Sequence, residues 1–218
     1  MIRTKCTYRR LLTLAVLGHL LLAASAMAAA PNKPHDTDTP PAAEKTRILV
    51  AYYSMTGNTQ RMAVAVAEGA RRVDGTNVVV KRVDEITKEH LTAADGIILG
   101  SPTYFAGMPG KMKTAIDDWN WKMKVDFTDK AGGAFATGGG QMGGKEHTVV
   151  SLLLFMINNR MVVAGPLFSD AEGDDKWAEV GAGAMTGPID PGVGEAELDS
   201  AHRLGERIAR LAKKMAAR

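Results

Sequence analysis

Apolar residues recur along this chain in two patterns that alternate. Short continuous apolar runs are typical of strands that are buried on both faces. Between them lie segments in which apolar residues return every three or four positions, as in helices with one buried face. The apolar runs lie at 47–54, 77–83, 96–101, 131–139 and 161–165, and the helical segments at 59–73, 87–94, 109–123, 146–159 and 195–215. Five alternations predict a doubly wound α/β domain, with a five-stranded parallel sheet covered by helices on both faces.

Two of the predicted helices show which residues should face the core. The shared face of the first holds Met62, Val66, Gly69, Ala70 and Val73, and that of the last holds Leu198, Ala201, Leu204, Ile208 and Leu211. We predict that Thr59 is the N-cap of the first helix, because a threonine hydroxyl can accept a hydrogen bond from a free backbone N–H group.

The first 46 residues follow neither pattern. A basic stretch precedes an apolar run at 11–24, and an A-x-A site follows it, which predicts a secretory signal peptide at 1–28 that is cleaved after Ala28. The apolar run is shorter than the roughly 20 residues that a spanning helix needs. Residues 29–46 are rich in proline, alanine, threonine and aspartate and predict a disordered leader. The folded domain should therefore occupy 47–218.

The route of export is suggested by Arg9 and Arg10, which stand directly before the apolar run. Such a pair is typical of twin-arginine signals, although two arginines also fit an ordinary basic n-region. The twin-arginine route carries folded proteins and suits a protein that acquires a cofactor before export. We expect a periplasmic mature form that does not span a membrane.

The net charge of +3 comes from this N-terminal segment. Of 27 basic residues, four lie in the first ten positions, so 23 remain against 24 acidic residues in the rest of the chain. No basic stripe is visible, which argues against a nucleic-acid partner. The single cysteine, Cys6, would leave with the signal peptide, so the mature protein would have neither disulfides nor thiol catalysis.

The loop after the first apolar run suits a phosphate. It consists of Ser54, Met55, Thr56, Gly57, Asn58 and Thr59, and a predicted helix follows it. Hydroxyls, backbone amides and a helix N-terminus bind anions. The loop has neither the lysine of the pattern G-x-x-x-x-G-K-[ST] nor the glycines of G-x-G-x-x-G, so a terminal monophosphate suits it best. An ordinary strand-to-helix turn is the alternative.

Two further loops lie at the carboxyl ends of predicted strands, where α/β sheets bind ligands. One contains Pro102, Thr103, Tyr104, Phe105, Ala106 and Gly107, and could pack against a flat ring. The other contains Thr137, Gly138, Gly139, Gly140, Gln141, Gly143 and Gly144, and would let the backbone pass close to a ligand. Each alone could be a plain connection, but three such loops at one edge of the sheet indicate a binding site.

These loops carry a family resemblance. In order and spacing, SMTGNT, GSPTYFAGMPGKMKTAID and ATGGGQMGGKEHT resemble the flavodoxin-like superfamily, and most of all the NAD(P)H:quinone oxidoreductases of the tryptophan-repressor-binding-protein type. The resemblance covers roughly residues 46–216. It implies a sheet of strand order 2-1-3-4-5 and an FMN cofactor, with NAD(P)H as an additional co-substrate.

The resemblance also implies where the parts of FMN lie. The 5′-phosphate would lie in residues 54–59, and the isoalloxazine ring between the loops at 102–107 and 137–144. The chemistry would take place at the flavin N5 atom, with no catalytic side chain. Trp119 and Trp121 either line the substrate pocket or pack in the protein. The family often forms dimers or tetramers.

Two positions depart from the family pattern. Thr56 stands where the family commonly has a bulky aromatic residue, and Asn158, Asn159 and Arg160 stand where it has His-His-Gly. These departures leave the use of NAD(P)H open. The main alternative is a flavodoxin-type electron carrier that acts through protein partners, and a third is a binding module that has lost the flavin.

The segment at 166–194 does not fit the alternation. It is rich in glycine, aspartate and proline and is predicted to be one long excursion before the last helix. Asp174 and Asp175 lie in it, and we interpret them as solvated acids rather than as metal ligands.

Overall fold

The computed structural model describes residues 45–140, 142–167, 180–186 and 192–217. The predicted signal peptide, most of the predicted leader, Gln141 and the pair Asp174 and Asp175 lie outside the described residues. The strands are β1 (Thr46–Tyr52), β2 (Thr76–Arg82), β3 (Gly96–Pro102), β4 (Ala131–Gly138), β5 (Val162–Val163) and β6 (Ala182–Met185). The helices are α1 (Asn58–Arg71), the single 3-10 turn η1 (Val83–Glu85), α2 (Lys88–Ala93), α3 (Gly110–Trp121), α4 (Lys145–Asn158) and α5 (Glu195–Ala216).

The described strands form one parallel sheet, as predicted. Its order is β2-β1-β3-β4-β5, with β6 also paired to β4, and every pairing is parallel. The order reverses direction beside β1, so the loops after β1 and β3 leave a crevice at the carboxyl edge of the sheet. This confirms the predicted doubly wound fold.

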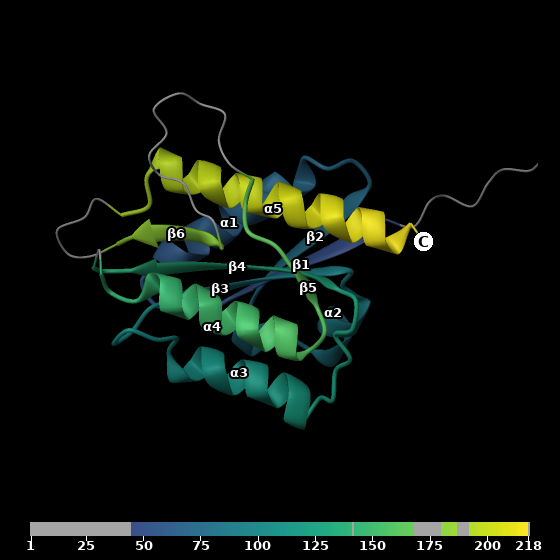
Figure 1. Cartoon of the computed structure of the whole chain (residues 1–218), viewed down its shortest axis with the longest axis horizontal. Helices are drawn as coiled ribbons and strands as arrows, with labels where there is room; N and C mark the ends of the chain where they lie inside the picture. The colour runs from purple at the N-terminus through teal and green to yellow at the C-terminus, as the bar shows by residue number, and fades with distance from the viewer. Residues whose placement is uncertain (1–44, 141, 168–179, 187–191, 218) are drawn as a thin grey trace, which may run out of the picture. The chain divides into compact units, whose positions relative to one another are not determined.

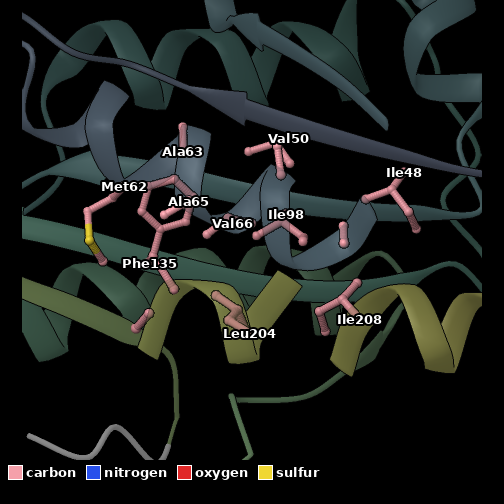
Figure 2. Packing of buried hydrophobic residues seen from close by; sticks show 14 of the residues in the cluster. Ile48, Val50, Met62, Ala63, Ala65, Val66, Ile98, Phe135, Leu204 and Ile208 are labelled. Atoms are coloured by element: carbon pink, nitrogen blue, oxygen red, sulfur yellow. The ribbon is translucent and has the colours of Figure 1, made fainter. Parts of the chain in front are cut away.

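Helices cover both faces of the sheet (Figure 1), and an apolar layer lies between the helices and the sheet on each face. On one face, α1 and α5 pack against Ile48 and Val50 of β1 and Phe135 of β4. Figure 2 shows this layer, in which Leu204 and Ile208 of α5 point toward the sheet. On the other face, α2, α3 and α4 pack against Leu49 of β1 and against other strand side chains that point to that face. Successive residues of β1 therefore point to opposite layers, as in a strand buried on both sides.

Close contact between α1 and α5 depends on two glycines. A Cβ atom added at Gly69 would overlap the backbone carbonyl oxygen of His202, and one added at Gly205 would overlap that of Val66. Each helix thus presents a gap into which the backbone of the other fits. The sequence placed Gly69 on the buried face of its helix, and the structure confirms that position.

The fifth strand differs from the prediction. The predicted strand at 161–165 is reduced to β5, which pairs with Ala131 and Gly132 at the start of β4. The chain returns as β6, which pairs with Phe135–Gly138 at the end of β4. The segment at 166–194 is therefore not one excursion, because a strand rejoins the sheet within it. The sequence AGAM is too short and too small in side-chain volume to show a strand pattern, and only pairing with β4 defines it.

The start of α1 also differs. The N-cap is Gly57, with a φ of 96°, and no side chain caps the helix. Thr59 lies inside the first turn, so its prediction as the N-cap was wrong. Its side chain is buried and bonds to another loop, as described below. None of the helices in the described part of the chain is both long enough and apolar enough to cross a membrane.

Candidate functional site

The loop after β1 forms a cradle at the N-terminus of α1. The Gly57 N–H donates to Ser54 Oγ at 3.1 Å and closes the loop into a tight turn. The first-turn N–H groups of a helix have no partner within the helix, and the first turn of α1 contains no acidic residue. Thr56 is exposed and Asn58 is half-buried, so both side chains can reach a ligand. This donor set suits an anion.

The loop after β3 is a tight two-residue turn. Tyr104 and Gly107 exchange backbone hydrogen bonds of 2.8 and 3.1 Å. The residues between them have positive φ values, 49° for Phe105 and 67° for Ala106, which is uncommon for residues other than glycine. The turn projects Phe105 fully into solvent. Strained backbone of this kind concentrates at functional sites.

The loop after β4 passes directly against that turn. Gly144 has a φ of 86°, and a Cβ atom there would lie 2.7 Å from the Cα atom of Ala106. Lys145 Nζ donates to the carbonyl of Gly140 at 2.7 Å and holds the glycine-rich segment folded back on α4. Glycine at position 144 is therefore required by both its conformation and its neighbour.

Hydrogen bonds join the three predicted loops. The hydroxyls of Thr59 and Thr137 lie 2.8 Å apart, and both side chains are buried. The Thr103 N–H donates to the carbonyl of Thr137 at 2.7 Å, and the Thr103 hydroxyl donates to that of Thr148 at 2.9 Å. The structure thus brings the loops together at one edge, as the sequence predicted.

Apolar side chains protrude from the tips of these loops. Met55, Phe105 and Met142 are 70%, 106% and 99% exposed, and each comes from a different loop. Exposed apolar side chains that gather at one place on a protein surface mark binding sites. An aromatic ring or a partner surface placed between the loops would cover them.

The two tryptophans do not join the loops. Trp119 is only 1% exposed and packs edge-on against Phe155 in the core below α3. Trp121 is 81% exposed at the end of α3, and a helix of this length carries it about 16 Å from the loop that precedes α3. Trp119 therefore packs in the core, although it also lines a cavity described below. Trp121 lies at the end of α3 that is farther from the three loops.

Two residues at this edge were not predicted. Arg82, the last residue of β2, donates to the Ser54 carbonyl at 2.9 Å and so braces the phosphate loop. Arg82 of β2 pairs with Tyr52 of β1, and both strands end at the same edge of the sheet. Aligning the two predicted strands would therefore have placed Arg82 beside the phosphate loop. His147, to which the sequence assigned no role, lies with Nδ1 2.9 Å from the carbonyl oxygen of Ala106. No sequence pattern indicates that contact, because it joins separate loops.

One titratable group of the site has a shifted pKa. Burial raises the pKa of Tyr104, and the neighbouring Tyr53 raises it further. The two tyrosines thus lie close together where the loops after β1 and β3 meet.

The fold and its loops define a doubly wound α/β protein with its ligand site at the carboxyl edge of the sheet. Comparisons with known proteins identify the family within this fold class. The sequence model of the family described as NADPH-dependent FMN reductase matches residues 82–175. A protein named NAD(P)H dehydrogenase (quinone) from Geobacter metallireducens is 34% identical over 202 residues, covering 78% of this chain and 98% of that protein.

Two further similarities extend over most of the chain. A protein named flavodoxin from Aquifex aeolicus is 38% identical over 163 residues, which cover 75% of this chain and 85% of that protein. The crystal structure of a flavodoxin, WrbA-like protein from Agrobacterium tumefaciens has a TM-score of 0.60 at 25% identity, covering 78% of this chain and 99% of that one. The chain belongs to the flavodoxin-like superfamily, in the group of FMN-dependent NAD(P)H:quinone oxidoreductases of the tryptophan-repressor-binding-protein type.

Proposed function

We propose that this protein is an FMN-dependent oxidoreductase that uses NAD(P)H to reduce quinone-like acceptors. The observation that carries the proposal is the meeting of three loops at the carboxyl edge, where hydroxyls and helix amides lie beside exposed apolar tips. Relatives named NAD(P)H dehydrogenase (quinone) support the choice of donor and acceptor.

The residues present fit FMN. A monophosphate needs several direct donors, which Ser54, Thr56, Asn58 and the first-turn amides of α1 supply without an opposing acid. A flat ring needs an apolar slot with close backbone approach, which the turn at 104–107 and the segment at 138–144 supply. These groups would hold FMN by its two ends.

The chain's own contribution is binding and orientation. When bound, FMN supplies hydride transfer at its N5 atom. The strained turn at 104–107 presents its backbone to the ring side of the site, and His147 holds the carbonyl of Ala106 in place. The exposed side chains of Phe105 and Met142 would exclude water from an acceptor that binds between the loops.

A flavodoxin-type electron carrier is the second candidate, favoured by the relative named flavodoxin. Carriers that dock on proteins through charge need a strongly charged face. Beyond the first ten residues this chain has 23 basic and 24 acidic residues, which gives no such excess. The enzyme is therefore the better-supported function.

Two measurements test the proposal. The purified protein should be yellow, with absorption maxima at roughly 375 and 450 nm from the cofactor, and should oxidise NADH or NADPH in a reaction that depends on menadione. A colourless protein that takes up no added FMN would contradict both candidates. A yellow protein that passes electrons only to a protein acceptor would favour the carrier.

Self-association would remove the exposed apolar tips from water, so we propose a homodimer or homotetramer. Light scattering coupled to size-exclusion chromatography measures this directly. A monomer at all concentrations would contradict it.

A further inference from the structure

A cavity lies next to the start of the phosphate loop. It measures about 570 Å³ and lies between η1 and one side of α3, along the length of that helix. Tyr53, which lines it, directly precedes Ser54 of the phosphate loop, and Gly110, which also lines it, directly follows the connection from the ring loop. None of the described residues that line the cavity belongs to the loops at 54–59, 102–107 and 137–144, so a molecule in it would lie beside the proposed FMN site rather than in its place.

The wall of the cavity is mostly apolar. Val83, Ile86 and Met123 contribute to it, together with the side of Trp119. Its volume falls in the range of about 300–1,000 Å³ that is usual for small-molecule and cofactor sites. The cavity is therefore large enough for a nucleoside.

Positive charge gathers at one side of the cavity. The guanidinium of Arg82 and the ammonium of Lys111 each lie 5.8 Å from the centre of the Tyr53 ring. Asp84 pairs with Arg82 at 3.2 Å, which offsets that charge. Within the described ranges, Lys111 has no carboxylate at ion-pair distance.

The other acid on the wall does not compensate Lys111. Asp118 pairs with Lys122 at 2.7 Å. Lys111 also stands in the first turn of α3, which holds no acidic residue and no side-chain cap. The free ammonium and the positive end of the helix both favour an anion here.

We propose that this cavity binds the adenosine-phosphate half of a nicotinamide dinucleotide, with the adenine against the apolar wall and a phosphate at Lys111. The inference rests on the proposed function, since it names how that enzyme holds its reductant. A quinone with a long aliphatic tail would also fill the apolar wall, but it has no anionic group to pair with the ammonium of Lys111.

Binding of a fragment tests the site. The probe is adenosine 2′,5′-bisphosphate, which carries the phosphates of this half of NADPH and no reactive ring. Calorimetric titration of the flavin-loaded protein should show saturable binding. Lys111→Gln should weaken it about tenfold, since a charge-assisted hydrogen bond is lost, and Lys111→Arg should retain most of it.

The matched control is Lys113→Gln. Lys113 lies two residues further along the same helix, and its ammonium is paired with Asp117 at 2.6 Å outside the cavity. This variant should bind the probe as the wild type does. Equal weakening by both glutamine variants would indicate a general effect of charge and would overturn the proposed contact.

Kinetics with two donors separate this site from the flavin chemistry. N-Benzyl-1,4-dihydronicotinamide donates hydride but lacks the adenosine-phosphate half. Lys111→Gln should raise the KM for NADPH about tenfold with little change in kcat, while its turnover with the benzyl compound should equal that of the wild type.

Each outcome has one meaning. A flavin-loaded protein that oxidises the benzyl compound but binds no bisphosphate overturns this inference and leaves the proposed function intact. An unchanged KM for NADPH in Lys111→Gln would also overturn this inference and leave the proposed function intact. A protein that binds no FMN overturns the proposed function and this inference with it.

Discussion

At the scale of single residues, the site depends on a contact between two backbones. Gly144 lies against Ala106, whose own φ of 67° is strained. His147, three residues along α4, contacts the carbonyl oxygen of the same alanine. The helix that follows the glycine-rich loop therefore holds the turn that we assign to the flavin ring.

Gly144→Ala should weaken FMN binding about tenfold or more. A Cβ atom at a φ of 86° is strained and would meet Ala106 at 2.7 Å, so the two loops must separate. Backbone strain of this kind costs about 1–3 kcal/mol, and about 1.4 kcal/mol corresponds to a tenfold change in affinity. Titration of FMN fluorescence measures the Kd. Gly110→Ala, where a Cβ atom meets nothing within 4 Å, is the control and should bind FMN normally.

Tyr104 should make the protein less stable in alkali. Its pKa is raised chiefly by burial, so the folded state holds the phenol proton more tightly than the unfolded chain does. This contribution is fully present below the unfolded pKa of about 10 and is lost as pH rises through the folded pKa. Urea unfolding of the wild type and Tyr104→Phe should give a constant difference below pH 10 and a relative loss for the wild type above it. Parallel curves across that range would rule the effect out.

At the scale of elements, α1 and α5 make the most extensive contact between two helices in the described part of the chain. Gly69 and Gly205 remove the side chains that would otherwise separate them, while Met62, Leu204 and Ile208 fill the layer next to the sheet. Because α1 begins at the phosphate cradle, its position against α5 also sets the direction of its N-terminal amides.

Gly205→Ala should destabilise the protein by about 2–3 kcal/mol. The new Cβ atom would overlap the carbonyl oxygen of Val66, so the helices must move apart and lose packing. Chemical denaturation followed by circular dichroism gives the free energy of unfolding. Gly110→Ala should instead be neutral or slightly stabilising, because alanine favours a helix and the site is open. A change of the same sign and size in both variants would contradict the packing argument.

At the scale of the whole molecule, binding FMN has a consequence for export. A non-covalent cofactor bound in loops from three strands requires the folded domain. We therefore propose that the chain is exported folded, through the pair Arg9 and Arg10 that precedes its apolar run.

Replacing both arginines by lysine should retain the protein, loaded with flavin, inside the cell. Lysine keeps the basic charge, so a general secretion signal would still function, whereas a twin-arginine signal would not. Cell fractionation with flavin fluorescence and immunodetection measures the distribution. Unchanged export of yellow protein would remove the twin-arginine interpretation.

Local pattern alone was enough to predict most of the architecture. Strand and helix periodicity placed β1 to β4 and α1 to α5 within a few residues, because these elements bury apolar faces whose spacing is visible in the sequence. It also placed the three loops on one edge, since all parallel strands end there. The residue types in the loops also predict which loop holds the phosphate of FMN and which loops hold its ring.

Tertiary structure decided what depends on contacts between distant segments. β6 exists because it pairs with the end of β4, although AGAM has no strand pattern of its own. Thr59 bonds to Thr137 instead of capping α1 because the fold brings their hydroxyls together. Trp119 is buried because α3 turns it toward the sheet.

The cavity beside Tyr53 has the same origin. Arg82 and Lys111 lie 29 positions apart in the chain and carry no motif, yet the end of β2 and the start of α3 bring both to one ring. The sequence by itself therefore determined the sheet, the helices and the edge at which the candidate loops meet, because their signals are local. Only the folded chain decided which side chains share a cavity, because that depends on the packing of helices against the sheet.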